Sequence, residues 1–130
     1  MGSKPVDLAN RTSRAQAQRV PVDGGMKLKE LQRVVADYVE QNQLETNVEH
    51  RLLDLMSEVG ELSKEALKAS AYGAGDFKPM TAWAEELGDV LFSLICVANT
   101  SGVDLEEALK SVLSKYRVRM SSKGSPESGH

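Results

Sequence analysis

Acidic residues recur on one side of two segments that both favour a helix. At about 100° per residue, four carboxylates of the first segment fall within about 60° of one another: Asp54, Glu58, Glu61 and Glu65. In the second segment, Glu86 and Asp89 share a similar arc. Two helices joined by a short loop should lie antiparallel, so we expect their acidic sides to face each other. The predicted acidic cluster consists of Glu58, Glu61, Glu86 and Asp89.

Carboxylates that face each other at the edge of a core either stay partly protonated or recruit a cation. Ligands that are all oxygens select hard ions, of which Mg²⁺ and Mn²⁺ suit phosphate chemistry. The alternative is a solvated helix face, which is what most charge runs are. An exposed face would favour lysines four residues later, but Glu58 and Glu61 are followed there by Leu62 and Glu65. The spacing by itself leaves both interpretations open.

Four segments carry the periodicity of amphipathic helices, and no segment is convincing as a strand. These helices are predicted at residues 27–43, 46–70, 81–99 and 104–120. Capping-box patterns open the second helix at Thr46 and the fourth at Asp104. The loop at residues 71–79 contains two glycines and a proline, which disfavour a helix. Short connections between amphipathic helices predict an all-α fold, an antiparallel four-helix bundle.

The third predicted helix is apolar on all sides over part of its length. Between Val90 and Ala98 only Ser93 is polar. A helix that is apolar all round is buried all round, and a domain of this size can hardly surround one of its own helices. We therefore expect this helix to pack against a second subunit, which predicts a homo-oligomer, either a dimer or a tetramer.

The composition of the chain argues against two kinds of partner, nucleic acids and membranes, and indicates a location in the cell. The 130 residues carry a formal net charge of −3, which argues against a nucleic-acid partner because nucleic-acid binding usually needs a basic surface. No apolar run reaches the roughly 18 residues that a membrane span requires, so no membrane is expected. Cys96 is the only cysteine, which rules out an intrachain disulfide. A reducing cytoplasm is the simplest location.

The two ends of the chain differ from its middle. Residues 1–25 are polar and lack helical periodicity, which is typical of a leader or a disordered tail. Residues 121–130 are rich in serine, glycine and proline and are predicted to be disordered. The functional domain is therefore predicted to span residues 26–120.

Two short motifs resemble the paired signatures of the MazG-like nucleotide pyrophosphohydrolases. The first is Glu58-Val59-Gly60-Glu61-Leu62, similar to the ExxE signature of that family. The second is Glu86-Leu87-Gly88-Asp89-Val90-Leu91, similar to its ExxD signature, with 24 residues between Glu61 and Glu86. The segment from Lys115 to Met120 is similar to the family's basic, aromatic closing segment. One departure is Leu113, where many members carry an asparagine.

The resemblance implies Mg²⁺-dependent hydrolysis of nucleoside triphosphates, with deoxynucleotides favoured, to a monophosphate and pyrophosphate. It further implies that Glu58, Glu61, Glu86 and Asp89 hold the metal and so carry the catalysis. The base that accepts the proton of the attacking water stays open, with Glu85 and Glu65 as candidates.

Four residues near the predicted acidic cluster or in the closing segment are candidates for contacts with the substrate: Lys68, Trp83, Lys115 and Arg119. The basic ones could steer a polyphosphate, although an ordinary solvated charge is the alternative for each. The indole could stack on a base, although a place in the core is the alternative.

Two other functions remain possible at this point. A phosphoribosyl-ATP pyrophosphohydrolase would use the same metal chemistry on one specific nucleotide. A non-catalytic helical interaction module would have an acidic face that binds no metal. A comparison of the turnover of different nucleotides would distinguish these two functions from hydrolysis of nucleoside triphosphates.

Overall fold

A computed structural model describes residues 25–123, and in them the chain forms four α-helices, one short 3₁₀ turn and no strand. The elements are α2 (Leu28–Gln41), α3 (Val48–Ala69), η1 (Ala71–Gly73), α4 (Thr81–Thr100) and α5 (Leu105–Lys123). The predicted all-α class is confirmed, and each helix lies within a few residues of its predicted position. The predicted leader or tail at residues 1–25 lies almost wholly outside the described residues. The tail at residues 121–130 was predicted to be disordered, but α5 continues through Lys123, so residues 121–123 are helical. Residues 124–130 lie outside the described residues.

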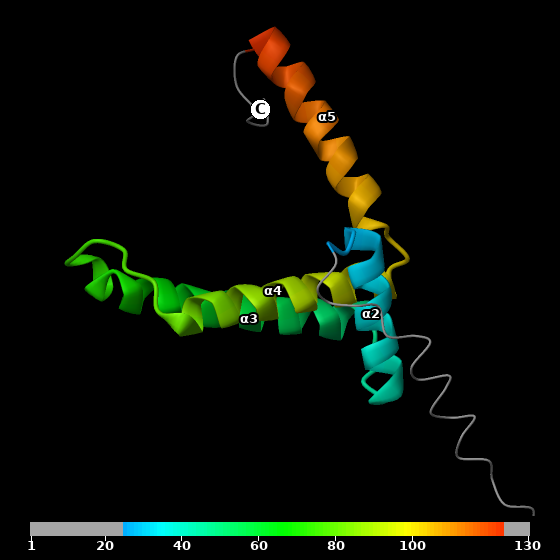
Figure 1. The fold of residues 1–130 in the computed structure, drawn as a ribbon, viewed down its shortest axis with the longest axis horizontal. Helices are drawn as coiled ribbons and strands as arrows, with labels where there is room; N and C mark the ends of the chain where they lie inside the picture. The colour runs from blue at the N-terminus through cyan, green and yellow to red at the C-terminus, as the bar shows by residue number, and fades with distance from the viewer. Residues whose placement is uncertain (1–24, 124–130) are drawn as a thin grey trace, which may run out of the picture.

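α3 and α4 run side by side as an antiparallel pair (Figure 1). Their pairing places the middle of α3 against the first half of α4. α3 begins with Asn47 as its cap, whose side-chain oxygen accepts a hydrogen bond from the backbone N–H of His50 at 2.9 Å. The prediction that Thr46 caps this helix is therefore wrong. The Thr46 hydroxyl instead lies 3.1 Å from Nδ1 of His50, and the asparagine one residue later reaches the free amide.

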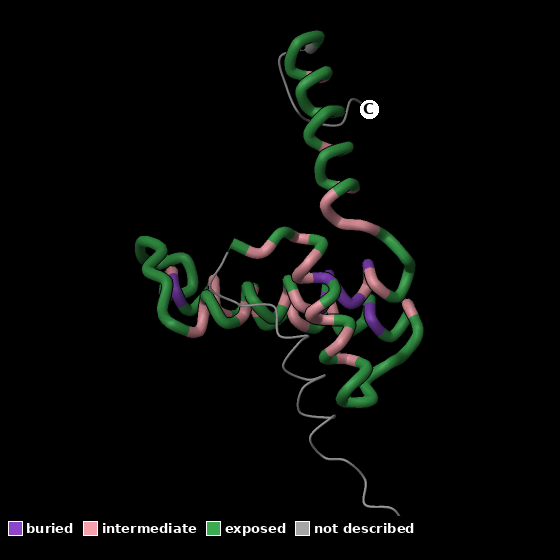
Figure 2. Tube along the Cα trace, turned by 45° about the vertical axis from the view of Figure 1, so that its right-hand side comes forward, coloured by how far each residue is buried: buried purple, intermediate pink, exposed green. Residues whose placement is uncertain are grey.

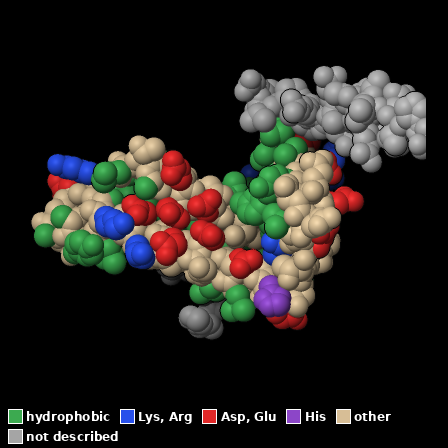
Figure 3. Space-filling model, turned by 90° about the horizontal axis from the view of Figure 1, so that it is seen from below, with side chains coloured by type: hydrophobic (Ala, Val, Ile, Leu, Met, Phe, Trp, Pro, Cys, Tyr) green, Lys and Arg blue, Asp and Glu red, His purple; other side chains and the backbone are tan. Residues whose placement is uncertain are grey.

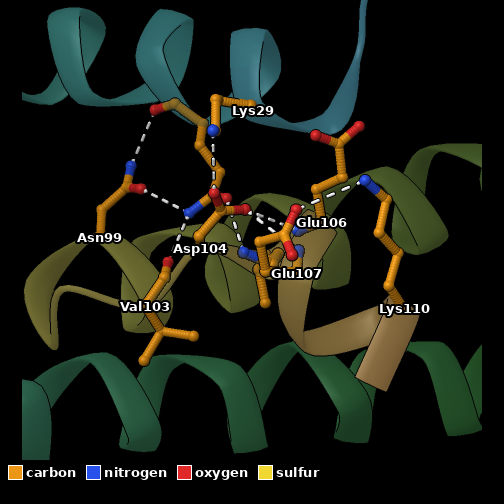
Figure 4. A network of polar contacts seen from close by, with 9 residues as sticks. Lys29, Asn99, Val103, Asp104, Glu106, Glu107 and Lys110 are labelled. Carbon is orange, nitrogen blue, oxygen red and sulfur yellow. Dashed lines mark hydrogen bonds and ion pairs between the residues drawn. The ribbon is translucent and has the colours of Figure 1, made fainter. Parts of the chain in front are cut away.

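α2 crosses one end of the pair, and one buried glutamine holds it there (Figures 1 and 4). The Gln32 amide donates to Oδ1 of Asn99 at 3.0 Å and to the carbonyl of Val103 at 2.9 Å. Its oxygen accepts from the backbone N–H of Leu105 at 2.8 Å. Asn99 in turn donates to the Gln32 carbonyl at 2.9 Å. These bonds satisfy a buried amide completely and fix α2 against the junction of α4 and α5.

α5 begins at Leu105, with Asp104 as its cap, and leads away from the α3–α4 pair (Figure 1). Oδ1 of Asp104 accepts from the backbone N–H groups of Glu106 and Glu107, at 3.0 and 3.2 Å, as the capping pattern predicts. Lys29 of α2 forms an ion pair with Oδ2 of Asp104 at 3.2 Å. One chain therefore contains an antiparallel pair, a crossing helix and a projecting helix, rather than a closed four-helix bundle.

The cap at Asp104 predicts a stability difference that depends on pH. The hydrogen bond from the Glu107 amide, followed by Lys29, holds the pKa of Asp104 below its usual value. A lowered folded-state pKa stabilises the fold above the unfolded pKa of about 3.9, and this contribution is lost as the pH falls through the folded value. Asp104→Asn should therefore melt at a lower temperature at pH 7, and the difference from wild type should shrink toward pH 3. Thermal melts followed by circular dichroism measure it, with Asp76→Asn in the exposed loop as control. A difference that stays constant with pH would contradict this account.

Most of the buried residues gather where α2 crosses α4, whereas Ala69 is buried at the far end of α3 (Figure 2). Ile95, Cys96 and Ala98 are at most 4% exposed. Leu91 and Leu94 of the same helix, which the sequence predicts to be buried, are 45% and 40% exposed in the single chain. Other large apolar side chains on α3 and α5 are exposed as well: Leu53, Met56, Leu109 and Val118. No single helix among the described residues is long and apolar enough to cross a membrane.

Candidate metal centre

Three carboxylates from two helices converge in the middle of the α3–α4 pair. Glu58 comes from α3, and Glu86 and Asp89 come from successive turns of α4. Each offers one oxygen, and these three oxygens all lie within 4.8 Å of one another. Figure 3 shows acidic side chains gathered on this part of the surface. The antiparallel pairing thus brings the two predicted acidic sides together.

The three converging carboxylates repel one another. The pKa of Glu86 is raised above its usual value, first by burial of the carboxyl and then by the charges of Asp89 and Glu58. Glu61 and Glu65 add to the effect from further along α3. A divalent cation would relieve this repulsion, and oxygen donors at such spacing are the ligands that Mg²⁺ and Mn²⁺ prefer. The donor set fits a hard divalent ion.

Glu61, the fourth residue of the predicted acidic cluster, lies beside the three but is not one of them. Its carboxylate is exposed and pairs with Lys64 at 3.5 Å. The two residues are three positions apart on α3, so the pair forms on the helix surface. Glu61 still acts on the site through its charge, because it contributes to the raised pKa of Glu86.

Glu65, a candidate base, forms an ion pair with Lys68, a candidate phosphate contact. Nζ of Lys68 donates to Oε1 of Glu65 at 3.1 Å, and this bond raises the pKa of the lysine. Both line a cavity of about 620 Å³ at the beginning of α4, together with Thr81 and Ala82. Glu85, the other candidate base, is exposed and has no ion-pair partner among the described residues.

Of the remaining predicted substrate contacts, Trp83 lies one turn before Glu86 on α4, whereas Lys115 and Arg119 belong to α5. The ring of Trp83 packs edge-on against Phe77, with 5.1 Å between centroids and an interplanar angle of 77°. Lys115 and Arg119 both lie over the ring of Tyr116, with Nζ 5.5 Å and Cζ 5.9 Å from its centroid. The tyrosine and its two basic neighbours belong to α5, which projects away from the helix pair (Figure 1).

A buried arginine is the notable residue that the sequence analysis missed. Arg51 of α3 is only 8% exposed, and its Nη2 donates to the carbonyl of Leu44. Its Nε is fully buried and has no hydrogen-bond partner in the described part of the chain. Arg51 lies seven positions before Glu58, so the two point to the same side of α3. This heptad spacing was the one available signal, but it does not distinguish a buried arginine from an exposed one.

The fold and the facing acidic helices define a class of all-α protein built around a carboxylate cluster. The family model of the MazG nucleotide pyrophosphohydrolase domain matches residues 46–122. The chain therefore belongs to the MazG nucleotide pyrophosphohydrolase family. The match includes α3, α4 and nearly all of α5, so it contains every residue of the predicted acidic cluster.

Solved structures agree with this assignment. The crystal structure of a Bacillus-conserved MazG protein, a nucleotide pyrophosphohydrolase, superposes with a TM-score of 0.61 at 33% identity, covering 72% of this chain and 92% of that one. The putative pyrophosphatase YpjD from Bacillus subtilis superposes with a TM-score of 0.61 at 34% identity, covering 74% and 98%. In a sequence comparison, the uncharacterized protein YpjD of Bacillus subtilis strain 168 is 41% identical over 71 residues. That alignment spans 50% of this chain and 60% of YpjD, so this chain matches less than two thirds of the length of YpjD.

Proposed function

We propose that this protein hydrolyses nucleoside triphosphates, deoxynucleotides among them, to a monophosphate and pyrophosphate, with Mg²⁺ or Mn²⁺ as the metal. The observation that carries the proposal is the convergence of Glu58, Glu86 and Asp89 from two helices. Membership of the MazG family supports the reaction class. The similar Bacillus-conserved MazG protein is a nucleotide pyrophosphohydrolase, which supports it further.

In this proposal the three carboxylates would hold the cation, and Glu61 would join them if it released Lys64. When bound, such a cation supplies charge neutralisation at the phosphates and lowers the pKa of a bound water. The carboxylates would keep the positive charge of the cation between the two helices. Without that charge, the acidic surface would repel a triphosphate. Glu85 or Glu65 accepts the proton of the attacking water. Glu85 is free to do so, whereas Glu65 must first release Lys68.

Release of pyrophosphate from a panel of nucleotides with Mg²⁺ tests this function. The panel contains the four deoxynucleoside triphosphates, the four ribonucleoside triphosphates and phosphoribosyl-ATP. We expect turnover of the triphosphates. Turnover of phosphoribosyl-ATP alone would identify the other pyrophosphohydrolase instead. An absence of turnover with any nucleotide would favour a helical interaction module.

We further propose that the protein is a homo-oligomer, a dimer or a tetramer. The support is an apolar side of α3 that one chain leaves exposed, where Leu52, Met56 and Val59 are 46%, 66% and 37% exposed. These residues are spaced by four and three positions, so they share one side of the helix, and exposed apolar faces of this kind mark contacts between proteins. Lys115 and Arg119 lie on the projecting helix, so they would contact a nucleotide held by another copy of the chain.

Light scattering at micromolar concentration should give at least twice the chain mass of 14.2 kDa. Met56→Glu places a charge in the exposed face of α3 and should shift the mass toward that of one chain. Met80→Glu is the matched control, because Met80 is 72% exposed and lies before α4 rather than on the face of α3. A wild-type protein with the mass of one chain would contradict the proposed assembly.

A further inference from the structure

A buried serine lies in line with the carboxylates of α4. Ser93 follows Asp89 by four residues and Glu86 by seven, so its side chain leaves the helix between the directions of those two carboxylates. It is 7% exposed and is one of three buried polar or charged residues in the described part of the chain. The other two, Gln32 and Arg51, are each anchored to a backbone carbonyl. Ser93 therefore places a buried hydroxyl on the side of α4 that carries the metal centre.

The hydroxyl of Ser93 has no hydrogen-bond partner among the described residues. Other hydroxyls of the same helix pair do have one, since those of Ser63 and Thr100 each donate to the carbonyl four residues earlier, both at 2.8 Å. Nε of Arg51 is the only side-chain polar atom in the described range that is both fully enclosed and unpaired, so the Ser93 oxygen keeps some accessible surface. Buried polar groups are normally paired. A polar group from outside the chain can reach this hydroxyl and pair with it.

Asp54 of α3 faces the same part of α4. It precedes Glu58 by four residues and lies on the same side of α3. In an antiparallel pair, a step back along α3 corresponds to a step forward along α4, so Asp54 lies beside the turn that follows Asp89. The pKa of Cys96, three residues beyond Ser93, is raised first by burial and then by the charge of Asp54, as this placement requires. Asp54 is exposed and has no ion-pair partner among the described residues.

The two ends of this line of polar groups differ in charge. Toward the loop that joins α3 to α4, Glu65 is neutralised by Lys68. Toward the α2 crossing, Asp54 keeps its charge, and the neighbouring Ser93 is neutral. A triphosphate is attracted to a lysine and repelled by an unpaired carboxylate. Its terminal phosphates therefore lie toward the loop, and the uncharged nucleoside points toward Ser93.

We propose that Ser93 and Asp54 bind the 3′-hydroxyl of the nucleotide sugar. This inference rests on the proposed function. The Ser93 hydroxyl donates to the sugar oxygen, and the sugar hydroxyl donates to Asp54, so each of these polar groups gains a partner. Ser93 lies about 6 Å beyond Asp89 along α4. The sugar is bonded directly to the α-phosphate, so it reaches this level when the phosphates lie at the metal centre.

Isothermal titration calorimetry of the full chain with Mg²⁺ tests the sugar contact without using hydrolysis. The two probes are 2′-deoxyadenosine 5′-monophosphate and 2′,3′-dideoxyadenosine 5′-monophosphate, which differ only in the 3′-hydroxyl. The wild-type protein should bind the first about tenfold more tightly, because one of its two hydrogen bonds is to a charged group. Ser93→Ala and Asp54→Ala should each lower this ratio toward one. A general effect of charge on phosphate binding cancels in the ratio.

Ser63→Ala is the matched control, because Ser63 follows Glu58 by five residues and lies on another side of α3. It should keep the full ratio. Ser93→Ala should not lower the thermal midpoint, because it removes a buried hydroxyl that has no partner. If Ser93→Ala does not fold, the exposed Asp54→Ala carries the test.

Equal binding of the two nucleotides by the wild-type protein would overturn the inference. A full ratio in both Ser93→Ala and Asp54→Ala would overturn it as well. If the monophosphates bind too weakly to measure, the ratio of kcat/KM between the corresponding triphosphates gives the same comparison. Continued release of pyrophosphate by the wild-type protein in any of these cases would leave the proposed function intact.

Discussion

Asp89→Asn should lower the rate of pyrophosphate release by at least about 10–100-fold, the range typical of a damaged metal site. The substitution keeps the size of the side chain and removes one charge from the three converging carboxylates. The loss should appear mainly in kcat, because the charge acts on the reacting phosphates more than on the rest of the nucleotide.

Asp76→Asn is the matched control, because it makes the same chemical change at an exposed position in the loop before α4. Steady-state assays of both variants, with circular dichroism to confirm the helices, measure the difference. If Asp89→Asn turned over as fast as Asp76→Asn, Asp89 would have no part in the site.

Mg²⁺ or Mn²⁺ should raise the thermal midpoint of the wild-type protein, because a ligand that binds only the folded state stabilises it. At a metal concentration of about 100 times Kd, the increase should be roughly 10 °C for a domain of about 100 residues. Glu58→Gln should abolish the shift, because it removes the charge of the only α3 carboxylate among the three. Glu107→Gln, on exposed α5, should retain it.

Glu61→Gln decides whether the fourth residue of the predicted acidic cluster binds the metal. If Glu61 leaves Lys64 for the cation, this variant should also lose the shift. An unchanged shift would remove Glu61 from the metal site and confine its role to the surface pair with Lys64.

The metal-induced shift should increase with pH. The raised pKa of Glu86 means that, without metal, this group stabilises the fold below its unfolded pKa, and the contribution is lost as the pH rises through the folded value. A cation competes with that proton, so metal binding strengthens as Glu86 ionises. Melts with and without Mg²⁺ at several pH values above about 4 follow the effect, and a shift that decreased as the pH rose would contradict it.

Local sequence patterns predicted the helices and three of the four residues of the acidic cluster that converge. Helical spacing places Glu58 on one side of α3 and both Glu86 and Asp89 on one side of α4, and a short loop forces the two helices to be antiparallel. These are properties of neighbouring residues along the chain, so they can be derived without tertiary structure. The same holds for the cap at Asp104, whose partners lie two and three residues away.

Features that depend on distant contacts could not be derived in this way. The direction of α5 is set by Gln32, which bonds to Val103 and Leu105 across more than 70 positions. From the sequence alone, Arg51 is expected to be an exposed charge. It is buried because it lies beside residues of α2 and α4 in the folded chain. The pair between Glu61 and Lys64 would compete with the proposed metal binding, and helical spacing allows both arrangements.

The identity of the products tests the central claim most directly. A deoxynucleoside triphosphate is incubated with the protein and Mg²⁺, and the products are separated by ion-exchange chromatography. Cleavage between the α- and β-phosphates predicts nucleoside monophosphate and pyrophosphate in equal amounts, with no diphosphate at any time. Nucleoside diphosphate together with orthophosphate would contradict the proposed reaction.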